Sequence, residues 1–249
     1  MRGHIGTNAN AAGFSAGRDD VFARIAGRYD LLCDIFSLGI HRIWKSHMAA
    51  RIAAHAGETV LDAASGTGHI PLRLLARGSR PGVLWVTDTC PQMLALARSR
   101  LAGAGEGLKF AVCDATNLEE FEAGTLDVYS ISFGMKICDR EKVVREAFRV
   151  LRPGGRFYCL EAARITFSPL HAAYLLYMDW CMPLIGRIAA NGDASAYAYL
   201  LKGIHDFPDQ EAFAAELRRA GFAPVAYRNL TLGIVALHEA VKPLDTEPA

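Results

Sequence analysis

The feature that most constrains the fold of this chain is the segment Val60–Ile70, VLDAASGTGHI, in which an apolar run opens into a tight glycine turn. The run carries Asp62 near its end, and a second acid, Asp88, follows the turn by twenty residues. This order is typical of the first strand–loop–helix unit of a doubly wound sheet, where a nucleotide-like group lies over the carboxyl end of the strand. Gly66 and Gly68 suit the turn because a Cβ atom there would obstruct a closely bound ligand.

The turn departs from the dinucleotide-binding fingerprint. That fingerprint needs a third glycine beside the pyrophosphate, and here Ile70 and Pro71 occupy that part of the turn. The sequence therefore favours a ligand that has an adenosine group and no pyrophosphate, which points to S-adenosylmethionine. A dinucleotide-dependent oxidoreductase is the weaker alternative, because it rests only on the two glycines and Asp88.

Composition excludes several classes of protein. The 249 residues suffice for one α/β domain, and a net charge of +1 with 21% charged residues gives no basic footprint for nucleic acid. No run approaches the roughly 20 apolar residues of a membrane span. The N-terminal residues lack the apolar core of a signal peptide, so we expect a cytoplasmic protein. Six scattered cysteines without a CxxC pair indicate reduced core thiols and no metal site.

The chain is expected to form one domain over residues 19–243, between a disordered N-terminus (1–18) and a C-terminal tail (244–249). Helices are predicted from Asp19 and through residues 29–55, with a break near Gly39. An insertion at 164–208 is rich in aromatic residues and is predicted to form a helical lid.

Between these parts, strands and helices alternate, which indicates an α/β fold with a parallel sheet covered on both faces. The predicted strands are Thr59–Ala63, Val83–Thr87, Lys109–Cys113, Leu126–Ile131 and Arg156–Glu161, followed by an antiparallel edge pair, Val225–Asn229 and Gly233–Glu239. The predicted helices are Ile70–Ala76, Pro91–Ala102, Arg140–Val150 and one that Asp209 caps and Gly221 ends. A turn is predicted at 152–155, Arg-Pro-Gly-Gly.

Longer segments narrow this to one family. RYDLLCDIFSLGIHRIWK (28–45), ISFGMK (131–136), FRVLRPGGRFYCLE (148–161), YLLKGIHDFPDQ (199–210) and AGFAPVAYRNLTLGIVALHEAVKP (220–243) resemble the ubiquinone and menaquinone C-methyltransferases. The resemblance implies a class I methyltransferase fold with seven strands, S-adenosylmethionine as cofactor and a prenylated benzoquinol or naphthoquinol as substrate. It also implies peripheral contact with the inner face of the membrane, and assembly as a homodimer or within a quinone-biosynthesis complex.

The resemblance also assigns roles in cofactor binding. Thr67 would contact the methionine part or the ribose, Asp88 would accept hydrogen bonds from the ribose hydroxyls, and Asp62 would orient the glycine loop. Asp114 and Ala115 stand where the family recognises adenine, since a carboxylate and a backbone N–H can pair with its edge. A further position, Ser132, closes the fourth strand beside the sulfonium.

Three departures from the family pattern concern the chemistry. His69 replaces the usual aspartate of the cofactor loop, Lys136 and Ile137 replace an Arg-Asn pair, and Ala162-Ala-Arg164 replaces Phe-Ser-Lys. They leave open a related group that installs an amino group on ubiquinone to make rhodoquinone. A non-catalytic subunit of the quinone pathway is a further alternative.

Methylation of a quinol carbon requires a base, or a cation that lowers the pKa of the ring hydroxyl. Lys136 is the first candidate, either as an ammonium beside the phenolate or, if buried, as a base. His41 and His205 are candidate proton relays, because imidazole titrates near neutrality. Tyr199 is a candidate hydrogen-bond partner of a ring oxygen. Each of the four also has a purely structural interpretation.

Overall fold

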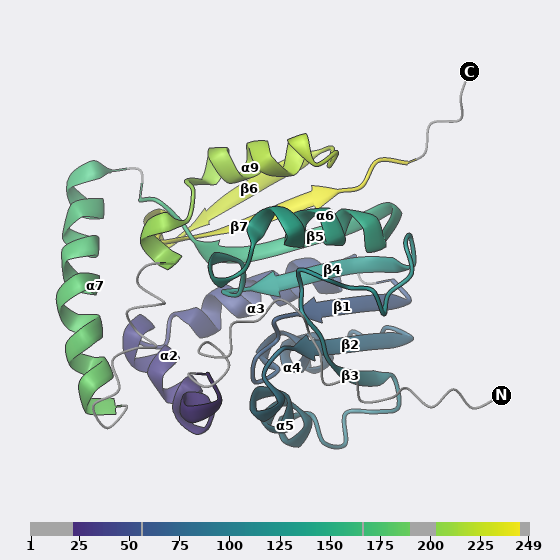
Figure 1. The fold of residues 1–249 in the computed structure, drawn as a ribbon, viewed down its shortest axis with the longest axis horizontal. Coiled ribbons are helices and arrows are strands. Elements are labelled where there is room, and N and C mark those ends of the chain that lie inside the picture. Colours follow the sequence, from purple (N-terminus) through teal and green to yellow (C-terminus); the bar gives the residue numbers. More distant parts are fainter. Residues whose placement is uncertain (1–21, 56, 166, 190–202, 245–249) are drawn as a thin grey trace.

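The computed structural model describes residues 22–55, 57–165, 167–189 and 203–244, and its centre is a seven-stranded mixed sheet with helices on both faces (Figure 1). The strand order is β3-β2-β1-β4-β5-β7-β6. The strands are β1 (Thr59–Ala63), β2 (Val83–Asp88), β3 (Leu108–Val112), β4 (Leu126–Ser132), β5 (Leu151–Ala162), β6 (Val225–Leu230) and β7 (Val235–Val241). The predicted α/β fold with seven strands is confirmed.

Only β7 runs against its neighbours. It pairs antiparallel with β5 and with the edge strand β6, whereas the other neighbouring strands pair in parallel. The predicted antiparallel pair at the end of the chain is confirmed. The order reverses between β1 and β4, so the carboxyl ends of these two strands flank the crevice in which doubly wound sheets bind ligands.

The helices of the structure are α2 (Tyr29–Ser37), α3 (His41–Ala53), α4 (His69–Ala76), α5 (Pro91–Arg100), α6 (Arg140–Val150), α7 (Ser168–Ala189) and α9 (Gln210–Arg219). Three short 3-10 turns are η1 (Ala26–Arg28), η2 (Met135–Ile137) and η3 (Thr231–Gly233). Figure 1 shows α2 and α7 beyond the carboxyl ends of β1 and β4. None of the helices in the described part of the chain combines the length and apolarity needed to cross a bilayer.

Strand side chains alternate between two cores. Leu61, Tyr129 and Phe157 pack beneath α6 and α9, and their neighbours Val60, Val128 and Tyr158 pack beneath α3 and α4. Because helices cover both faces of the sheet, nearly every residue of the central strands is apolar, and these apolar runs allowed the strands to be predicted from the sequence.

The predicted start and end of α9 are also confirmed. Asp209 accepts a hydrogen bond from the Ala212 amide at 2.9 Å and caps α9, and Gly221, just past its end, has φ +102°. The break between α2 and α3 falls at Leu38 and Gly39, both with positive φ.

The prediction of a turn at 152–155 was wrong. These residues lie inside β5, which begins at Leu151. Leu126 pairs with Leu151 and the next paired residue, Val128, meets Arg156, so the Pro-Gly-Gly sequence forms a bulge that the strand absorbs. Pairing on both sides of the bulge outweighs the local turn preference.

Candidate cofactor and substrate site

The glycine loop follows β1 and presents an open backbone surface. Gly66 has φ +58°, and a Cβ built there would meet no atom within 4 Å, so the space beside it is free for a ligand. Gly68 has φ +78°, and its Cβ would lie 3.1 Å from the Cβ of Ala97 on α5. The two glycines therefore have different functions: one leaves room for a ligand, and the other allows close packing of the loop on α5.

Asp62 lies behind this loop. Its carboxylate accepts hydrogen bonds from Ser65 at 2.5 Å and from Ser130 at 2.6 Å, so it connects the loop to β4. Burial raises the pKa of Asp62 to about 6, although both hydroxyls favour the ionised form. Asp62 is not among the residues that line the cavity, and its function in orienting the loop stays a prediction.

A first cavity lies at the carboxyl ends of β1, β2 and β4. Five of the residues predicted to bind the cofactor line it together: Gly66, Asp88, Asp114, Ala115 and Ser132. Asp88 accepts hydrogen bonds from the amides of Gly66 (2.8 Å) and Cys90 (2.9 Å). Its carboxylate therefore also connects β2 to the glycine loop, a structural contribution that sequence reasoning did not anticipate.

Thr67 points away from this cavity. Its hydroxyl donates to Asp30 on α2 at 2.7 Å, and His69 Nε2 lies 3.0 Å from the same carboxylate oxygen. Arg100 pairs with the other oxygen of Asp30. Burial opposes ionisation, but the nearby His69 ring and the hydrogen bond from Thr67 hold the pKa of the Asp30 carboxyl well below its usual range. These four side chains, here called the Asp30 cluster, attach α2 to the cofactor loop.

The backbone is strained beside the cavity. Ala64 (φ +47°) and Phe133 (φ +57°) both have positive φ without being glycine. They follow β1 and β4, and a Cβ on Gly134 would approach Ala64 Cβ to 2.7 Å. Such conformations persist where the surrounding structure enforces them, and they gather at functional sites.

A second cavity, of about 300 Å³, adjoins the first and is lined mainly by apolar residues. Its walls come from α2, α3, η2, η3 and α7, and Tyr29 and Phe133 line both cavities. The two spaces therefore meet at these two rings. A cavity bordered by a glycine loop and two aspartates, with an adjacent apolar cavity, can hold a nucleoside-like group next to an apolar substrate.

Lys136 lines the apolar cavity, but its ammonium is already engaged. Nζ pairs with Glu161 Oε1 at 3.0 Å and donates to the Phe133 carbonyl at 2.5 Å. The side chains of Lys136 and Glu161 are 6% and 1% exposed. Lys136 therefore does not extend into solvent. Its function as the catalytic cation stays a prediction.

Glu161 was missed by sequence reasoning, although a charged residue inside the apolar run FYCLEA signals a buried, paired acid.

His41 also lines the apolar cavity. Its Nε2 lies 2.8 Å from Asp34 Oδ1, and its Nδ1 is buried and has no hydrogen-bond partner among the described residues. Burial lowers the pKa of His41 to about 4, so the ring is neutral at neutral pH. A relay of protons through His41 stays a prediction.

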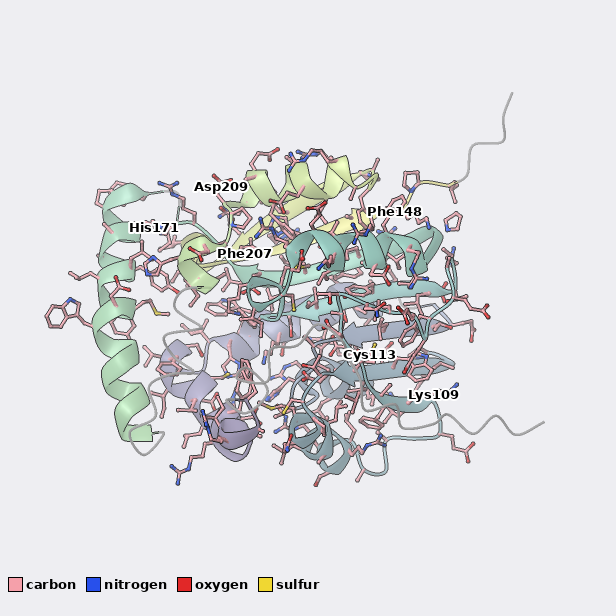
Figure 2. All side chains as sticks on the ribbon, in the orientation of Figure 1. Lys109, Cys113, Phe148, His171, Phe207 and Asp209 are labelled. Atoms are coloured by element: carbon pink, nitrogen blue, oxygen red, sulfur yellow. The ribbon has the colours of Figure 1, made fainter. Side chains whose placement is uncertain are left out.

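The remaining two candidates are Tyr199 and His205. Tyr199 is outside the described residues. His205 does not line the apolar cavity; its Nε2 lies 2.9 Å from Asp179 on α7, and it borders a separate small pocket together with His171 and Phe207. Figure 2 shows those two neighbours between α7 and the sheet. His205 is therefore not among the residues that line the apolar cavity, and its function as a proton relay stays a prediction.

A second lysine, Lys45 on α3, lines the same cavity and was also missed. The signal was available, because Lys45 precedes Met48, Ala49 and Ile52 by three, four and seven residues and so lies on the buried face of its helix. Burial lowers the pKa of the Lys45 ammonium.

Comparisons with known proteins agree with this geometry. The model of the "ubiE/COQ5 methyltransferase family" matches residues 14–242. The chain belongs to this family. A curated relative from Acidiphilium cryptum, a "Ubiquinone/menaquinone biosynthesis C-methyltransferase UbiE", is 44% identical over 225 residues, which is 88% of each chain. A protein of the same name from Cereibacter sphaeroides is 42% identical over 96% of each chain.

Solved structures show the same fold at low identity. An S-adenosylmethionine-dependent methyltransferase from Thermotoga maritima has a TM-score of 0.65 at 15% identity and covers 90% of this chain and 99% of its own. A phosphoethanolamine N-methyltransferase from Haemonchus contortus, solved with S-adenosylmethionine, has a TM-score of 0.54 at 19% identity, covering 76% of this chain and 49% of its own.

The family assignment makes the chain a methyltransferase that uses S-adenosylmethionine. It does not favour the amino-transfer alternative or a dinucleotide-dependent oxidoreductase, since the curated relatives are C-methyltransferases.

Proposed function

We propose that this protein transfers the methyl group of S-adenosylmethionine to a ring carbon of a prenylated quinol. The observation that carries the proposal is the pair of joined cavities, one bordered by the glycine loop, Asp88 and Asp114, the other apolar and lined in part by two lysines. The curated relatives at 42–44% identity, which are named for ubiquinone and menaquinone biosynthesis, support this substrate class.

The residues of the first cavity fit the cofactor. Gly66 leaves space at its backbone, the Asp88 carboxylate can accept ribose hydroxyls, and Asp114 with Ala115 can pair with the adenine edge. When bound, the cofactor supplies an electrophilic methyl group. We place Ser132, at the end of β4, beside the reacting end of this cavity.

The apolar cavity fits a prenylated ring. Its apolar lining favours an isoprenoid chain and excludes water, which strengthens the interaction of a charged quinolate with the lysines. Helix α7 would act as a lid, because its residues Tyr174, Tyr177 and Met178 form part of the wall.

The proposal is tested by incubating the purified protein with methyl-labelled S-adenosylmethionine and a panel of demethylated benzoquinols and naphthoquinols. Mass spectrometry of the product should show one labelled methyl group on a ring carbon. An aminated ring, or no labelled product with any quinol of the panel, would contradict it.

We also propose that the mouth of the apolar cavity contacts a membrane. Leu38 (80% exposed) and Tyr177 (42%) line the cavity and are open to solvent. Further exposed apolar side chains on the same elements are Leu31, Leu176 and Trp180. A tail leaving the cavity at this point would enter lipid directly.

The test is sedimentation with phosphatidylcholine vesicles. Leu38→Glu with Trp180→Glu should reduce the bound fraction, whereas Leu96→Glu on α5, away from this mouth, should not. Equal binding of all three proteins would refute the contact.

Light scattering of the same samples without vesicles would show whether the protein is a homodimer.

A further inference from the structure

The apolar cavity contains a lysine that no described acid neutralises. Lys45 is 6% exposed and lines the cavity. Over the described ranges of the chain, its ammonium forms no hydrogen bond and no ion pair. Lys136, in the same cavity, is neutralised by Glu161. The two lysines therefore differ in what they can offer a substrate.

Three acidic groups act on the Lys45 ammonium: Cys33 most strongly, then Asp30 and Asp62. The Cys33 thiol lines the same cavity, and burial raises its pKa, which favours the uncharged thiol. The two carboxylates have other partners. Asp30 is engaged by Thr67, His69 and Arg100, and Asp62 by two serine hydroxyls behind the glycine loop. Both attract the ammonium without reaching it. A buried lysine without a counter-ion is costly to the fold, because desolvation of the charge is not repaid.

Lys45 lies next to the junction of the two cavities. Its Nζ is 5.8 Å from the centroid of the Phe133 ring, which lines both cavities, and the Trp44 ring centroid lies 6.2 Å from that of Phe133. Lys136 Nζ lies 5.3 Å from the same centroid, so the two lysines share this position and are distinguished by the ion pair of Lys136 with Glu161. A quinol ring bound against Phe133 would therefore lie next to these lysines and next to the cavity bordered by the glycine loop.

We propose that Lys45 is the base that takes the proton of the quinol hydroxyl and then holds the quinolate by its positive charge. The inference rests on the proposed function and deepens it. Burial lowers the pKa of Lys45, which favours its neutral form with a free lone pair, and no described acid forms an ion pair with it, whereas the ammonium of Lys136 is held by Glu161.

The step balances as follows. The O–H bond of the quinol breaks, its electron pair stays on oxygen, and the proton bonds to Lys45 Nζ. The ortho carbon of the ring forms a bond to the methyl carbon, and the electron pair of the broken carbon–sulfur bond stays on sulfur. The ring carbon then loses its proton to water, which restores the aromatic ring, and Lys45 returns its proton to the ring oxygen.

The first experiment measures ionisation of a bound phenol without turnover. The probe is an alkylated nitrophenol, whose phenolate has its own visible absorption band, at a pH where the free probe is partly ionised. The wild-type protein should lower the pKa of the bound probe by about one unit or more. Lys45→Met should abolish this shift. Lys109→Met should keep it, because Lys109 lies on β3 at the edge of the molecule opposite α7 (Figure 2).

The second experiment measures turnover with a demethylated quinol. Lys45→Met should lower kcat about a hundredfold, with unchanged calorimetric affinity for S-adenosylmethionine, since a base acts chiefly in the transition state. Lys45→Arg should still ionise the probe but turn over as slowly as Lys45→Met, because a guanidinium cannot accept a proton. Intact cofactor binding in each variant also shows that it is folded.

Wild-type turnover by Lys45→Met would overturn the inference. So would a probe shift that survives in Lys45→Met and is lost in Lys136→Met, since the charge would then come from Lys136. If the wild-type protein methylates no quinol but shifts the probe through Lys45, the proposed substrate class fails and the charge assignment stands.

Discussion

At the scale of single residues, several carboxylates near the candidate site accept hydrogen bonds from other parts of the chain, so they also stabilise the local structure. Asp88 is an example, because it lines the first cavity and its carboxylate oxygens already accept hydrogen bonds from two backbone amides. A substitution at such a position changes the shape of the cavity together with its chemistry, and the design of a variant has to separate the two.

Asp88→Ala should weaken binding of S-adenosylmethionine about tenfold to a hundredfold, because hydrogen bonds to a charged group contribute about 1.5–3 kcal/mol. Isothermal calorimetry measures this affinity. Asp88→Asn keeps an acceptor oxygen and should lose less. Unchanged affinity in a folded Asp88→Ala protein would remove Asp88 from the cofactor site.

Lys136→Met should destabilise the fold by about 3–5 kcal/mol, because it leaves the buried Glu161 carboxylate without its cation. Denaturant unfolding measures the loss. Adding Glu161→Gln to Lys136→Met should recover much of it, since no buried charge then remains. If Lys136→Met unfolds like the wild type, the ion pair is not important for stability, and its activity can be read directly as a test of the catalytic cation.

At the scale of elements, the Asp30 cluster connects four of them. It attaches α2 to the glycine loop through Thr67, to the start of α4 through His69 and to the end of α5 through Arg100. His69 stands where the family usually has an aspartate. Arg73 donates to its Nδ1 at 2.9 Å, which leaves the Nε2 proton facing Asp30.

Asp30→Asn should loosen α2 and weaken cofactor binding several-fold, because the charge that Thr67, His69 and Arg100 share is lost. Hydrogen exchange should rise in residues 29–37 and stay constant in α6 and α9. Glu211→Gln, which breaks the exposed pair with Arg218, is the matched control and should change neither quantity. Equal protection of α2 in Asp30→Asn and wild type would argue against this role for the cluster.

At the scale of the whole molecule, stability should depend on buried neutral histidines. Burial lowers the pKa of His238 to about 4, as it does for His41. His238 is 1% exposed; its Nε2 lies 2.9 Å from the Gln210 carbonyl, and its ring meets Phe213 edge-on. It therefore joins β7 to α9 as an uncharged group.

The direction in which stability changes with pH follows from the number of protons bound by the folded and the unfolded chain. Between pH 6.5 and about 4 the unfolded chain binds more protons at His238 than the folded chain, so stability is lost as pH falls through this window. The loss should reach about 3 kcal/mol for a shift of this size. His238→Gln should be less stable than wild type at pH 7.5 but should lose less Tm between pH 7.5 and pH 5. Parallel decreases in Tm would contradict this.

What the sequence determined by itself was set by short-range patterns. Apolar runs, helical spacing and the Asp209 cap depend on neighbours within a few residues. The strands, the helices and the glycine turn could therefore be predicted from the sequence, and many of the predicted element ends differ from the observed ones by a few residues. The sequence also placed five cofactor-binding candidates correctly at one sheet edge, because carboxyl ends of parallel strands meet there.

Only the tertiary structure decided which groups meet across long separations. Lys136 and Glu161 are 25 residues apart, Thr67 and Asp30 are 37 apart, and Lys45 reaches the Phe133 ring from another element. Packing also turned the Pro-Gly-Gly sequence into a bulge of β5. Charge, burial and protonation are properties of such non-local neighbours, so the identity of the unpaired lysine could emerge only from the folded chain.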